Sequence, residues 1–207
     1  MEKRKIGLVS LGAVNLLLLI SILVINSKLK VNVNSADVAT VSSPDQSEAM
    51  EHESFVKEEY IPVIPEGKNI AIDKKVKANG FEDVYTPRKV VDGNAEGVSY
   101  WEGKGDSYPN TLTVDLEKEE TIHTIRLCLN PSSAWGKRTQ EISIEASADG
   151  KKFEEIIPSS SYDFDPDTGN QVTIPLEEVK TRYVQVTFTS NTGANGGQLA
   201  EREVYKK

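Results

Sequence analysis

Hydrophobic and polar residues alternate in short runs along the chain from about Asn69 onward. One run places Leu112, Val114 and Leu116 on one side and polar residues on the other, and residues 142–146 and 184–188 repeat this pattern. Alternation with a period of two is typical of half-buried strands in an antiparallel sheet. We therefore expect several such strands, with their apolar sides packed together.

Turn signals separate these runs. Asp149-Gly150 lies between residues 141–147 and 152–157, which predicts a β-hairpin, and Gly169-Asn170 marks another turn before residues 172–174. No convincing amphipathic helix follows residue 69. About 140 residues with about eight short strands predict an all-β fold, an antiparallel β-sandwich of the jelly-roll type.

The beginning of the chain has a different pattern. Residues 1–5 include Lys3-Arg4-Lys5, whereas residues 6–25 carry no charge. A helix of that length spans about 30 Å, enough to cross a bilayer. We interpret it as a transmembrane helix, retained as a signal-anchor or cleaved as a signal peptide. The basic start should stay in the cytoplasm. The chain is therefore expected to be a single-pass protein of the cell membrane with an extracytoplasmic C-terminal domain, or else a secreted protein.

Residues 26–66 are rich in serine, valine and acidic residues and show no periodicity. Between residues 37 and 66 about eight acidic residues face about one basic residue, and such a segment repels itself and stays solvated. We expect a flexible acidic linker, with a docking tail for a basic partner as the alternative. The domain itself is expected over residues 67–207.

Charge and cysteine content exclude some classes of function and structure. The formal net charge is −8, and no segment after the first residues is basic enough to bind a nucleic acid backbone. The single cysteine, Cys128, excludes an intrachain disulfide bond and lies in a strand pattern, so a packed thiol is expected. An exported domain without disulfides needs another clamp, and a bound metal is one candidate.

One glycine-bent loop combines oxygen-bearing side chains. Asp92 and Asn94 flank Gly93, and the hydroxyl of Ser99 follows. Glu201 supplies another carboxylate about a hundred residues later, in a strand-like setting. Calcium takes about six to eight oxygen ligands, many of them neutral. These stretches together suggest a calcium site that would join the two ends of the domain.

Several motifs occur in an order and spacing that resemble a known family. They are Asn69-Ile70-Ala71, Val91-Asp92-Gly93-Asn94, Trp101, Leu112-Thr113-Val114-Asp115-Leu116, Ser147-Ala148-Asp149-Gly150, Arg182-Tyr183-Val184 and Ala200-Glu201-Arg202-Glu203-Val204-Tyr205. Together they resemble a discoidin domain, also called coagulation factor 5/8 type C, whose bacterial members form carbohydrate-binding module family 32. The resemblance spans about residues 67–207. It implies a jelly-roll sandwich with its termini close together, a structural calcium ion near one end, and ligand-binding loops at that same end.

The resemblance also implies roles for individual residues. The calcium ligands would be the carboxylates of Asp92 and Glu201, the side chains or carbonyls of Asn94 and Ser99, and the carbonyls of Lys89 and Ala200. Asn94 and Ser99 stand about two residues farther apart than is usual in the family, and a serine replaces the commoner threonine. Trp101 would lie next to the calcium loop and pack inward.

The ligand-binding residues are expected in loops with turn-rich sequences. Trp135 lies in the loop from Asn130 to Arg138, where an exposed indole could stack on a sugar ring. Arg138 and Gln140 could donate hydrogen bonds to sugar hydroxyls. The alternative is that Trp135 only closes the core. Other polar candidates occupy the loops 101–110 and 189–197, and they are Glu102, Lys104, Tyr108 and Asn191.

These features predict a surface-displayed carbohydrate-binding module with a structural calcium ion and no catalytic activity. The alternative is a protein-binding or adhesion module of the discoidin type. No nucleophile motif such as Gly-x-Ser-x-Gly occurs, and His123 lies in a strand run, which indicates a structural role. The segment Asp163–Gly169 resembles the start of an EF-hand loop, but Pro166 and the absence of a glutamate at the twelfth position exclude that interpretation.

Overall fold

A computed structural model describes residues 60–207. The predictions for residues 1–59, which are the basic start, the transmembrane segment 6–25 and most of the acidic linker, lie outside the described residues. Within residues 60–207 no helix has the length and apolar character needed to span a membrane.

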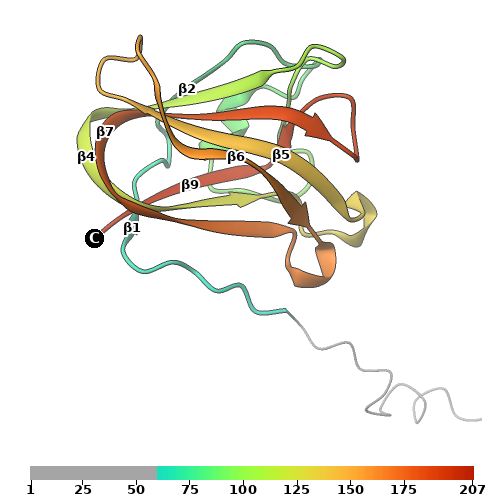
Figure 1. Cartoon of the computed structure of the whole chain (residues 1–207). Helices are drawn as coiled ribbons and strands as arrows, with labels where there is room; N and C mark the ends of the chain where they lie inside the picture. The colour runs from blue at the N-terminus through green and yellow to red at the C-terminus, as the bar shows by residue number, and fades with distance from the viewer. Residues whose placement is uncertain (1–59) are drawn as a thin grey trace, which may run out of the picture. The chain divides into compact units, whose positions relative to one another are not determined.

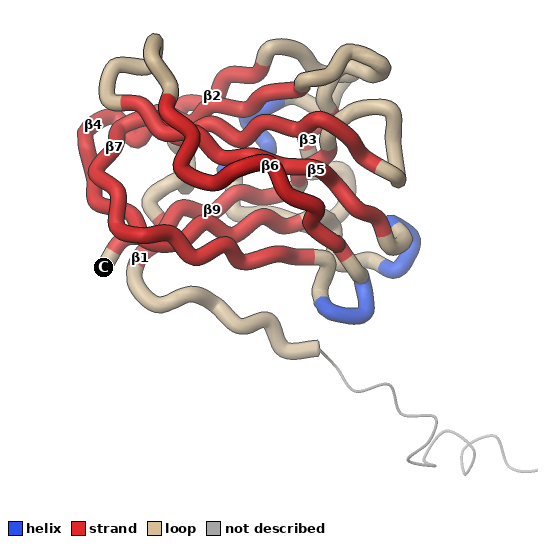
Figure 2. The backbone as a smooth tube through the Cα atoms, viewed as in Figure 1, coloured by secondary structure: helices blue, strands red, loops and turns tan. Residues whose placement is uncertain are grey.

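The described part of the chain is built almost entirely from antiparallel strands (Figure 1, Figure 2). Short 3-10 helices (η) occupy some of the connections between them. The elements are β1 (Lys68–Asn69), β2 (Lys75–Ala78), η2 (Pro87–Val91), β3 (Trp101–Glu102), β4 (Asn110–Cys128), η3 (Ser133–Trp135), β5 (Arg138–Ser147), β6 (Glu154–Phe164), η4 (Pro166–Thr168), β7 (Gln171–Asn191), β8 (Gln198–Leu199) and β9 (Glu201–Lys206).

Two long strands, β4 and β7, pair with each other and bend together from one layer of the sandwich into the other (Figure 1). The first half of β4 pairs with β2, and the second half pairs with β9. The second half of β7 pairs with β5, which pairs in turn with β6. We call the layer of β2, β5 and β6 the front layer and the layer of β9 and β1 the back layer. The predicted antiparallel β-sandwich is confirmed.

The prediction of uniformly short strands is wrong, because β4 has 19 residues and β7 has 21. The alternation stops at the polar stretch from Glu117 to Glu120, and the β4–β7 register shifts between Asp115 and Glu120. Glu117 there has a φ of 72°. Polar residues at the bend face water, while the strand pairing resumes beyond a bulge. A break in the hydrophobic pattern therefore marks a corner of the sandwich and not the end of a strand.

Aliphatic residues from both layers meet in one core. Leu112, Val186 and Ile144 from the front layer and Ile125 and Val204 from the back layer are fully buried. These are inward positions of the alternating runs, and burial of such side chains stabilises the fold by about 1.5–3 kcal/mol each. The predicted hairpin is also present, because β5 and β6 flank the turn at Asp149-Gly150.

Three side chains with predicted structural roles lie as expected. Trp101 is fully buried, and its Nε1 donates to the carbonyl of Gly80 over 3.2 Å. Cys128 is buried, and this burial raises the pKa of its thiol to about 12. His123 is half-buried in β4, with its Nδ1 2.8 Å from the hydroxyl of Thr124. A packed thiol and a packed tryptophan are confirmed.

The last residues of the predicted linker contact the domain. The hydroxyl of Tyr60 accepts a hydrogen bond from Gln171 Nε2 over 2.8 Å. Its ring lies against Gly169, which has a φ of +76° and where an added Cβ would come within 2.5 Å of the Tyr60 ring. Composition predicts that these residues belong to a flexible segment. The contacts of Tyr60 with Gly169 and Gln171 could not be predicted from composition.

Candidate functional site

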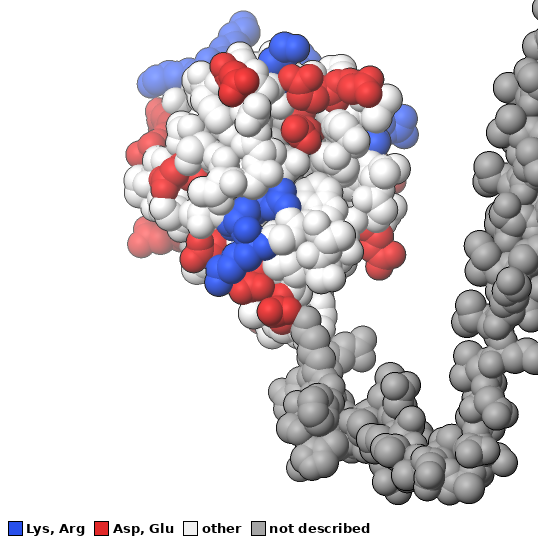
Figure 3. All heavy atoms as spheres, turned by 90° about the vertical axis from the view of Figure 1, so that its right-hand side faces the viewer, with Lys and Arg blue, Asp and Glu red and all other residues white. Residues whose placement is uncertain are grey.

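Loops that are far apart in the sequence gather at one end of the sandwich, to the right in Figure 1, and we call this the loop end. Backbone hydrogen bonds join them, from Gly103 N to Gly197 O over 2.8 Å and from Thr192 N to Thr139 O over 3.0 Å. Figure 3 faces this end and shows basic side chains gathered near the middle of the face, with acidic side chains around them.

Gln198 lies at the centre of a hydrogen-bond network at the loop end. Strand β8 pairs with β3, and this pairing sets Gln198 directly beside Glu102. The Gln198 side chain donates to Glu102 Oε2 over 3.0 Å and accepts from Arg138 Nη1. Asn191 Nδ2 lies 3.4 Å from Gln198 Oε1 and donates to Gly196 O over 2.8 Å. Three segments of the chain, at Glu102, Arg138 and Asn191, are thereby joined by one side chain.

Gln140, on β5, forms two hydrogen bonds with the backbone of Gln198. Its Nε2 donates to the carbonyl of Gln198 over 3.0 Å, and its Oε1 accepts from Gln198 N over 2.8 Å. Gln140 is fully buried. The prediction that Gln140 contacts a ligand therefore needs correction, because both ends of its amide are used internally. Its place on β5 gives it the role of positioning Gln198.

Three aromatic rings lie beside the network. Tyr85 and Tyr100 are stacked with their centroids 4.2 Å apart, and Trp135 meets Tyr100 edge-on at 4.7 Å. The Arg138 guanidinium carbon lies 5.0 Å from the Trp135 ring centroid, and Lys89 Nζ lies 5.6 Å from the Tyr85 centroid. Such ring–ring and cation–ring contacts fix the orientation of the side chains. All three rings remain partly accessible to solvent.

Burial dominates the electrostatics of this region. Arg138 is only 8% exposed, and its burial lowers the pKa of the guanidinium, against the opposing effect of Glu102. Burial also raises the pKa of Tyr100, with a further contribution from its hydrogen bond to Tyr85. Arginine is not deprotonated in proteins, so the Arg138 guanidinium stays charged at neutral pH although much of its surface is shielded from water.

The structure brings together five of the six predicted ligand residues, namely Trp135, Arg138, Gln140, Glu102 and Asn191. Tyr108 makes no hydrogen bond to them, and its half-buried side chain packs against the core. The Tyr108 hydroxyl is buried without a partner, and burial raises its pKa. Lys104, from the same loop, is exposed and lies 3.7 Å from Glu82.

Sequence reasoning missed Gln198, Tyr85 and Tyr100. Gln198 follows two glycines at the end of a loop, and its importance depends on partners that are between 7 and 96 positions away in the chain. The only available signal was that Gln198 immediately precedes the family-like motif at residues 200–205. Tyr100 precedes Trp101, which was expected to pack inward, and no separate feature of the sequence indicates that Tyr100 lies at the site.

A second cluster at the loop end contains the predicted calcium ligands Asp92 and Glu201. Asp92 directly follows η2 and accepts from Ser99 Oγ over 2.5 Å and from Asn94 N over 2.9 Å. Glu201 opens β9, is only 3% exposed, and accepts from Gly93 N over 3.1 Å through Oε2. The structure thus brings the Asp92 loop and the last strand together.

Glu201 has a pronounced electrostatic imbalance. Its Oε1 is buried and has no hydrogen-bond partner. Burial raises the pKa of Glu201 to about 8, the hydrogen bond from Gly93 opposes this, and the charge of Asp92 adds to it. An unpartnered carboxylate oxygen near a second carboxylate is costly unless a proton or a cation neutralises it. The donor set of hard oxygens therefore fits a calcium ion.

The remaining predicted calcium ligands have different surroundings. The Asn94 side-chain oxygen accepts from Glu96 N over 2.9 Å, so part of its capacity is used within the loop. Lys89 lies in η2, and Ala200 lies between β8 and β9. Among the described residues, no group of three or more histidine, cysteine or acidic side chains could hold a metal ion. A cation here would depend on two carboxylates and on neutral oxygens.

Comparisons with known proteins agree with this fold. One solved relative is chitosan-binding module 1 of a chitosanase/glucanase from Paenibacillus sp. IK-5, with 20% identity over 67% of this chain and 99% of that chain and a TM-score of 0.55. Another is a CBM32 module from Clostridium perfringens in complex with GalNAc-β-1,3-galactose, with 19% identity over 65% and 96% and a TM-score of 0.54.

A third relative is the CBM32 module of AlyQ in complex with 4,5-unsaturated mannuronic acid, with 20% identity over 66% and 98% of the two chains and a TM-score of 0.55. At these identities the likeness shows the fold. No curated protein matches the chain at a significant level. The family model described as F5/8 type C domain matches residues 75–202, which is more than half of the sequence. The chain therefore belongs to the F5/8 type C domain family.

Proposed function

We propose that this protein is a carbohydrate-binding module without catalytic activity, and that its loop end binds a glycan. The observation that carries the proposal is the convergence of Glu102, Arg138 and Asn191 on Gln198, beside the ring of Trp135. A carboxylate, a guanidinium and amides held by hydrogen bonds offer both acceptors and donors to sugar hydroxyls. An aromatic ring next to them can cover an apolar face of a pyranose.

Preorganisation is the physical advantage of this site. The network members are already paired, so a ligand would not have to order them, and the entropy cost of binding decreases. A shallow site with one aromatic contact and a few hydroxyl contacts binds weakly. Display of many copies on one surface would raise the avidity without any new contact.

The relatives support this choice of ligand class. Among the solved neighbours, one is a chitosan-binding module, one is in complex with 4,5-unsaturated mannuronic acid, and one is in complex with GalNAc-β-1,3-galactose. Several of these relatives are modules of larger enzymes. The carbohydrate-binding role, and not an enzymatic one, is the part that corresponds to a domain of this size.

We also propose a structural calcium ion held by Asp92 and Glu201, with oxygens from Lys89, Asn94, Ser99 and Ala200 completing the set. Support comes from the unpartnered Glu201 Oε1 and from the adjacent charge of Asp92. A cation there would compensate both carboxylates and join the Asp92 loop to β9, which stabilises the folded domain.

The proposed location rests on the first residues of the sequence. A transmembrane helix over residues 6–25 would hold the protein in the cell membrane, with the acidic linker as a spacer and the domain outside the cytoplasm. If the segment is cleaved as a signal peptide, the same domain would be secreted.

A glycan array tests the loop-end site. The purified full chain, the Trp135→Ala variant and the Tyr60→Ala variant would be compared at equal concentration. Tyr60 is an exposed aromatic residue that precedes β1 and contacts Gly169, so it controls for loss of an aromatic ring elsewhere. We expect the wild type and Tyr60→Ala to bind the same glycans, and Trp135→Ala to lose at least tenfold in affinity.

Equal binding of a glycan by Trp135→Ala and the wild type would contradict the assigned loop. Absence of binding by the wild type to every glycan would contradict the function itself. Release of a product from any glycan would contradict the non-catalytic role, and chromatography of the array supernatants detects it.

A further inference from the structure

A second groove lies on the outer face of the front layer, outside the Gln198 network. Its volume is about 550 Å³, within the range of about 300–1,000 Å³ that is common for small-molecule sites. Strands β2, β4 and β7 and the turn before β6 contribute to it. Its lining includes Lys75, Lys77, Thr113, Phe153, Tyr183 and Gln185.

Two aromatic rings form part of its wall. Tyr183 is fixed from two directions, because an added Cβ at Gly150 would come within 3.1 Å of the ring and the Arg182 guanidinium carbon lies 4.9 Å from the ring centroid. Phe153, on the same turn as Gly150, is half-buried. The groove therefore has a rigid apolar side that can contact the C–H groups of a ligand without first becoming ordered.

The floor of the groove consists of paired polar groups. Thr113 Oγ1 donates to Gln185 Oε1 over 3.0 Å. Asp115 accepts from Arg182 Nε and Nη2 over 2.7 and 2.9 Å, so this bidentate pair compensates its charge. The groove thus contains no carboxylate that is free to repel an anion.

No acidic side chain in residues 60–207 is paired with the two lysines at the edge of the groove. Lys75 and Lys77 lie on the same side of β2, two residues apart, and both are exposed. Within the described residues neither forms an ion pair. Asp115 lies opposite Lys75 in the β2–β4 pairing, but its carboxylate is bound by Arg182. Glu117, the next acidic residue of β4, is 2.5 Å from Lys74 Nζ. In a chain of net charge −8, an uncompensated pair of cations beside a groove is an attraction for an anionic ligand.

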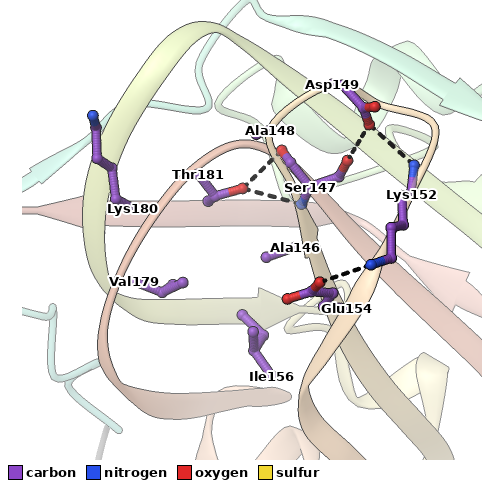
Figure 4. Close-up of a pocket in the computed structure, with 10 residues that line it drawn as sticks. All are labelled: Ala146, Ser147, Ala148, Asp149, Lys152, Glu154, Ile156, Val179, Lys180 and Thr181. Carbon is purple, nitrogen blue, oxygen red and sulfur yellow. Dashed lines mark hydrogen bonds and ion pairs between the residues drawn. The ribbon is translucent and has the colours of Figure 1, made fainter.

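In a neighbouring groove, the polar and charged side chains are paired with other groups of the protein (Figure 4). It has a volume of about 370 Å³ and lies on the other side of the turn that joins β5 to β6. Thr181 Oγ1 accepts from Ser147 N over 3.1 Å and donates to Ser147 O over 2.9 Å. Its lysines are paired, Lys152 with Glu154 over 3.4 Å and Lys180 with Glu119 over 3.2 Å. The groove beside Lys75 and Lys77 differs because these two lysines form no ion pair within the described residues.

We propose that the groove bounded by Lys75, Lys77, Phe153 and Tyr183 is a second saccharide site, selective for an acidic sugar of the uronate class. The two ammonium groups would bind the carboxylate, the aromatic rings would contact the apolar side of the pyranose, and Gln185 and Thr113 would face its hydroxyls. This site uses none of the residues of the loop end and does not depend on the function proposed there.

A second explanation for the lysines is protection of the sheet edge, since β2 is an edge strand and lysine on an edge strand blocks pairing with another chain. That role requires positive charge but no groove and no ligand. A binding experiment with a charged sugar and its uncharged ester separates the two.

Trigalacturonic acid would be titrated into the full chain by calorimetry, alongside its methyl ester, which has the same rings without the charges. The variants are Lys75→Gln/Lys77→Gln and, as a matched control, Lys118→Gln/Lys180→Gln, which removes the same charge from paired surface lysines. We expect at least tenfold weaker binding of the acid by the first variant, less than twofold change in the control, and at least tenfold weaker binding of the ester by the wild type.

Amide chemical shifts locate the bound sugar. The acid should shift the signals of Lys77, Gly150 and Phe153, and Trp135→Ala should leave these shifts unchanged, whatever happens to binding at the loop end. Equal affinity of the two lysine variants, equal affinity for acid and ester, or shifts confined to residues 130–138 would each overturn the proposal. So would absence of binding by the wild type, and the lysines would then serve only to protect the sheet edge.

Discussion

Two clusters at the loop end differ in how their polar groups are paired, although only three positions separate Gln198 from Glu201. The Gln198 network consists of Gln198, Glu102, Arg138, Gln140 and Asn191, and none of these residues has a buried side-chain polar atom without a partner. In the Asp92–Glu201 cluster, Glu201 Oε1 is buried without a partner, and its acidic neighbour Asp92 makes the imbalance larger.

This difference indicates which cluster requires a bound proton or cation to be stable. A satisfied network is stable by itself and offers a fixed surface to a ligand. A buried carboxylate beside another carboxylate is unstable at neutral pH unless it binds a proton or a cation. The Asp92–Glu201 cluster should therefore control stability, and the Gln198 network should control recognition.

Removal of calcium should have the largest effect on stability. Because the folded pKa of Glu201 is raised to about 8 from 4.5, the contribution of Glu201 to the stability of the metal-free domain is fully present below about pH 4.5 and is lost as pH rises toward 8. The loss amounts to roughly 5 kcal/mol at most. Chelation at pH 7.5 should lower the melting temperature by on the order of 10 °C, measured by calorimetry, and chelation at pH 5 should have much less effect.

The opposite dependence on pH, or no response to chelation at either pH, would contradict the cation site. Calcium added back after chelation is the control, and it should restore the melting temperature at pH 7.5. Magnesium at the same concentration should restore less, since its smaller shell demands a stricter geometry.

The Glu201→Gln substitution should separate a metal-binding carboxylate from a merely structural one. Glutamine keeps an oxygen for Gly93 N but carries no charge, so the metal-free variant should be about 1–3 kcal/mol more stable than the metal-free wild type at pH 7.5. Added calcium should then raise its melting temperature very little. Urea unfolding in chelator gives the comparison.

Glu203→Gln provides the control for this change, because Glu203 lies on the same strand and pairs with Arg126 over 2.8 Å. That variant should keep the full calcium response and lose some stability. A Glu201→Gln protein that responds to calcium as the wild type does would remove Glu201 from the proposed set of ligands.

Most of the fold could be predicted from local pattern. The alternating aliphatic residues around Val114, Ile144 and Val186 correctly marked inward positions, because every second side chain of a strand faces the core. The bend of β4 could not be predicted as such, since polar residues such as Glu117 equally indicate a loop. Tyr60 also lay beyond such reasoning, because its contact with Gly169 joins segments about a hundred residues apart.

The candidate site was predictable only in part. Trp135 and Arg138 could be found, because aromatic and basic residues in a turn-rich loop need an explanation. Gln140 was found but given the wrong role, since no local pattern says which polar residue of β5 will be buried. Gln198 has no signature of its own, and its role arises from the pairing of β8 with β3 and from three loops that converge on it.

The Gln198→Ala substitution sharpens the contrast between the clusters, because we expect it to change recognition more than stability. The substitution leaves the nearly buried Arg138 without its side-chain acceptor, which costs about 1–3 kcal/mol. Glu102 and Asn191 lose their common partner and gain freedom that a ligand must then restrict. We expect at least tenfold weaker glycan binding, with an unchanged response to calcium, measured by calorimetry and thermal unfolding.

Gln171→Ala is the matched control, because Gln171 also accepts a hydrogen bond from a nearly buried arginine, Arg126 Nε, over 2.7 Å. It lies on the back layer, so its loss should lower stability to a similar extent and leave glycan affinity within twofold. If both variants bound glycan equally well, the network would be structural only. If Gln198→Ala also lost its calcium response, the two clusters would be one cooperative unit, since β8 leads directly through Ala200 into β9.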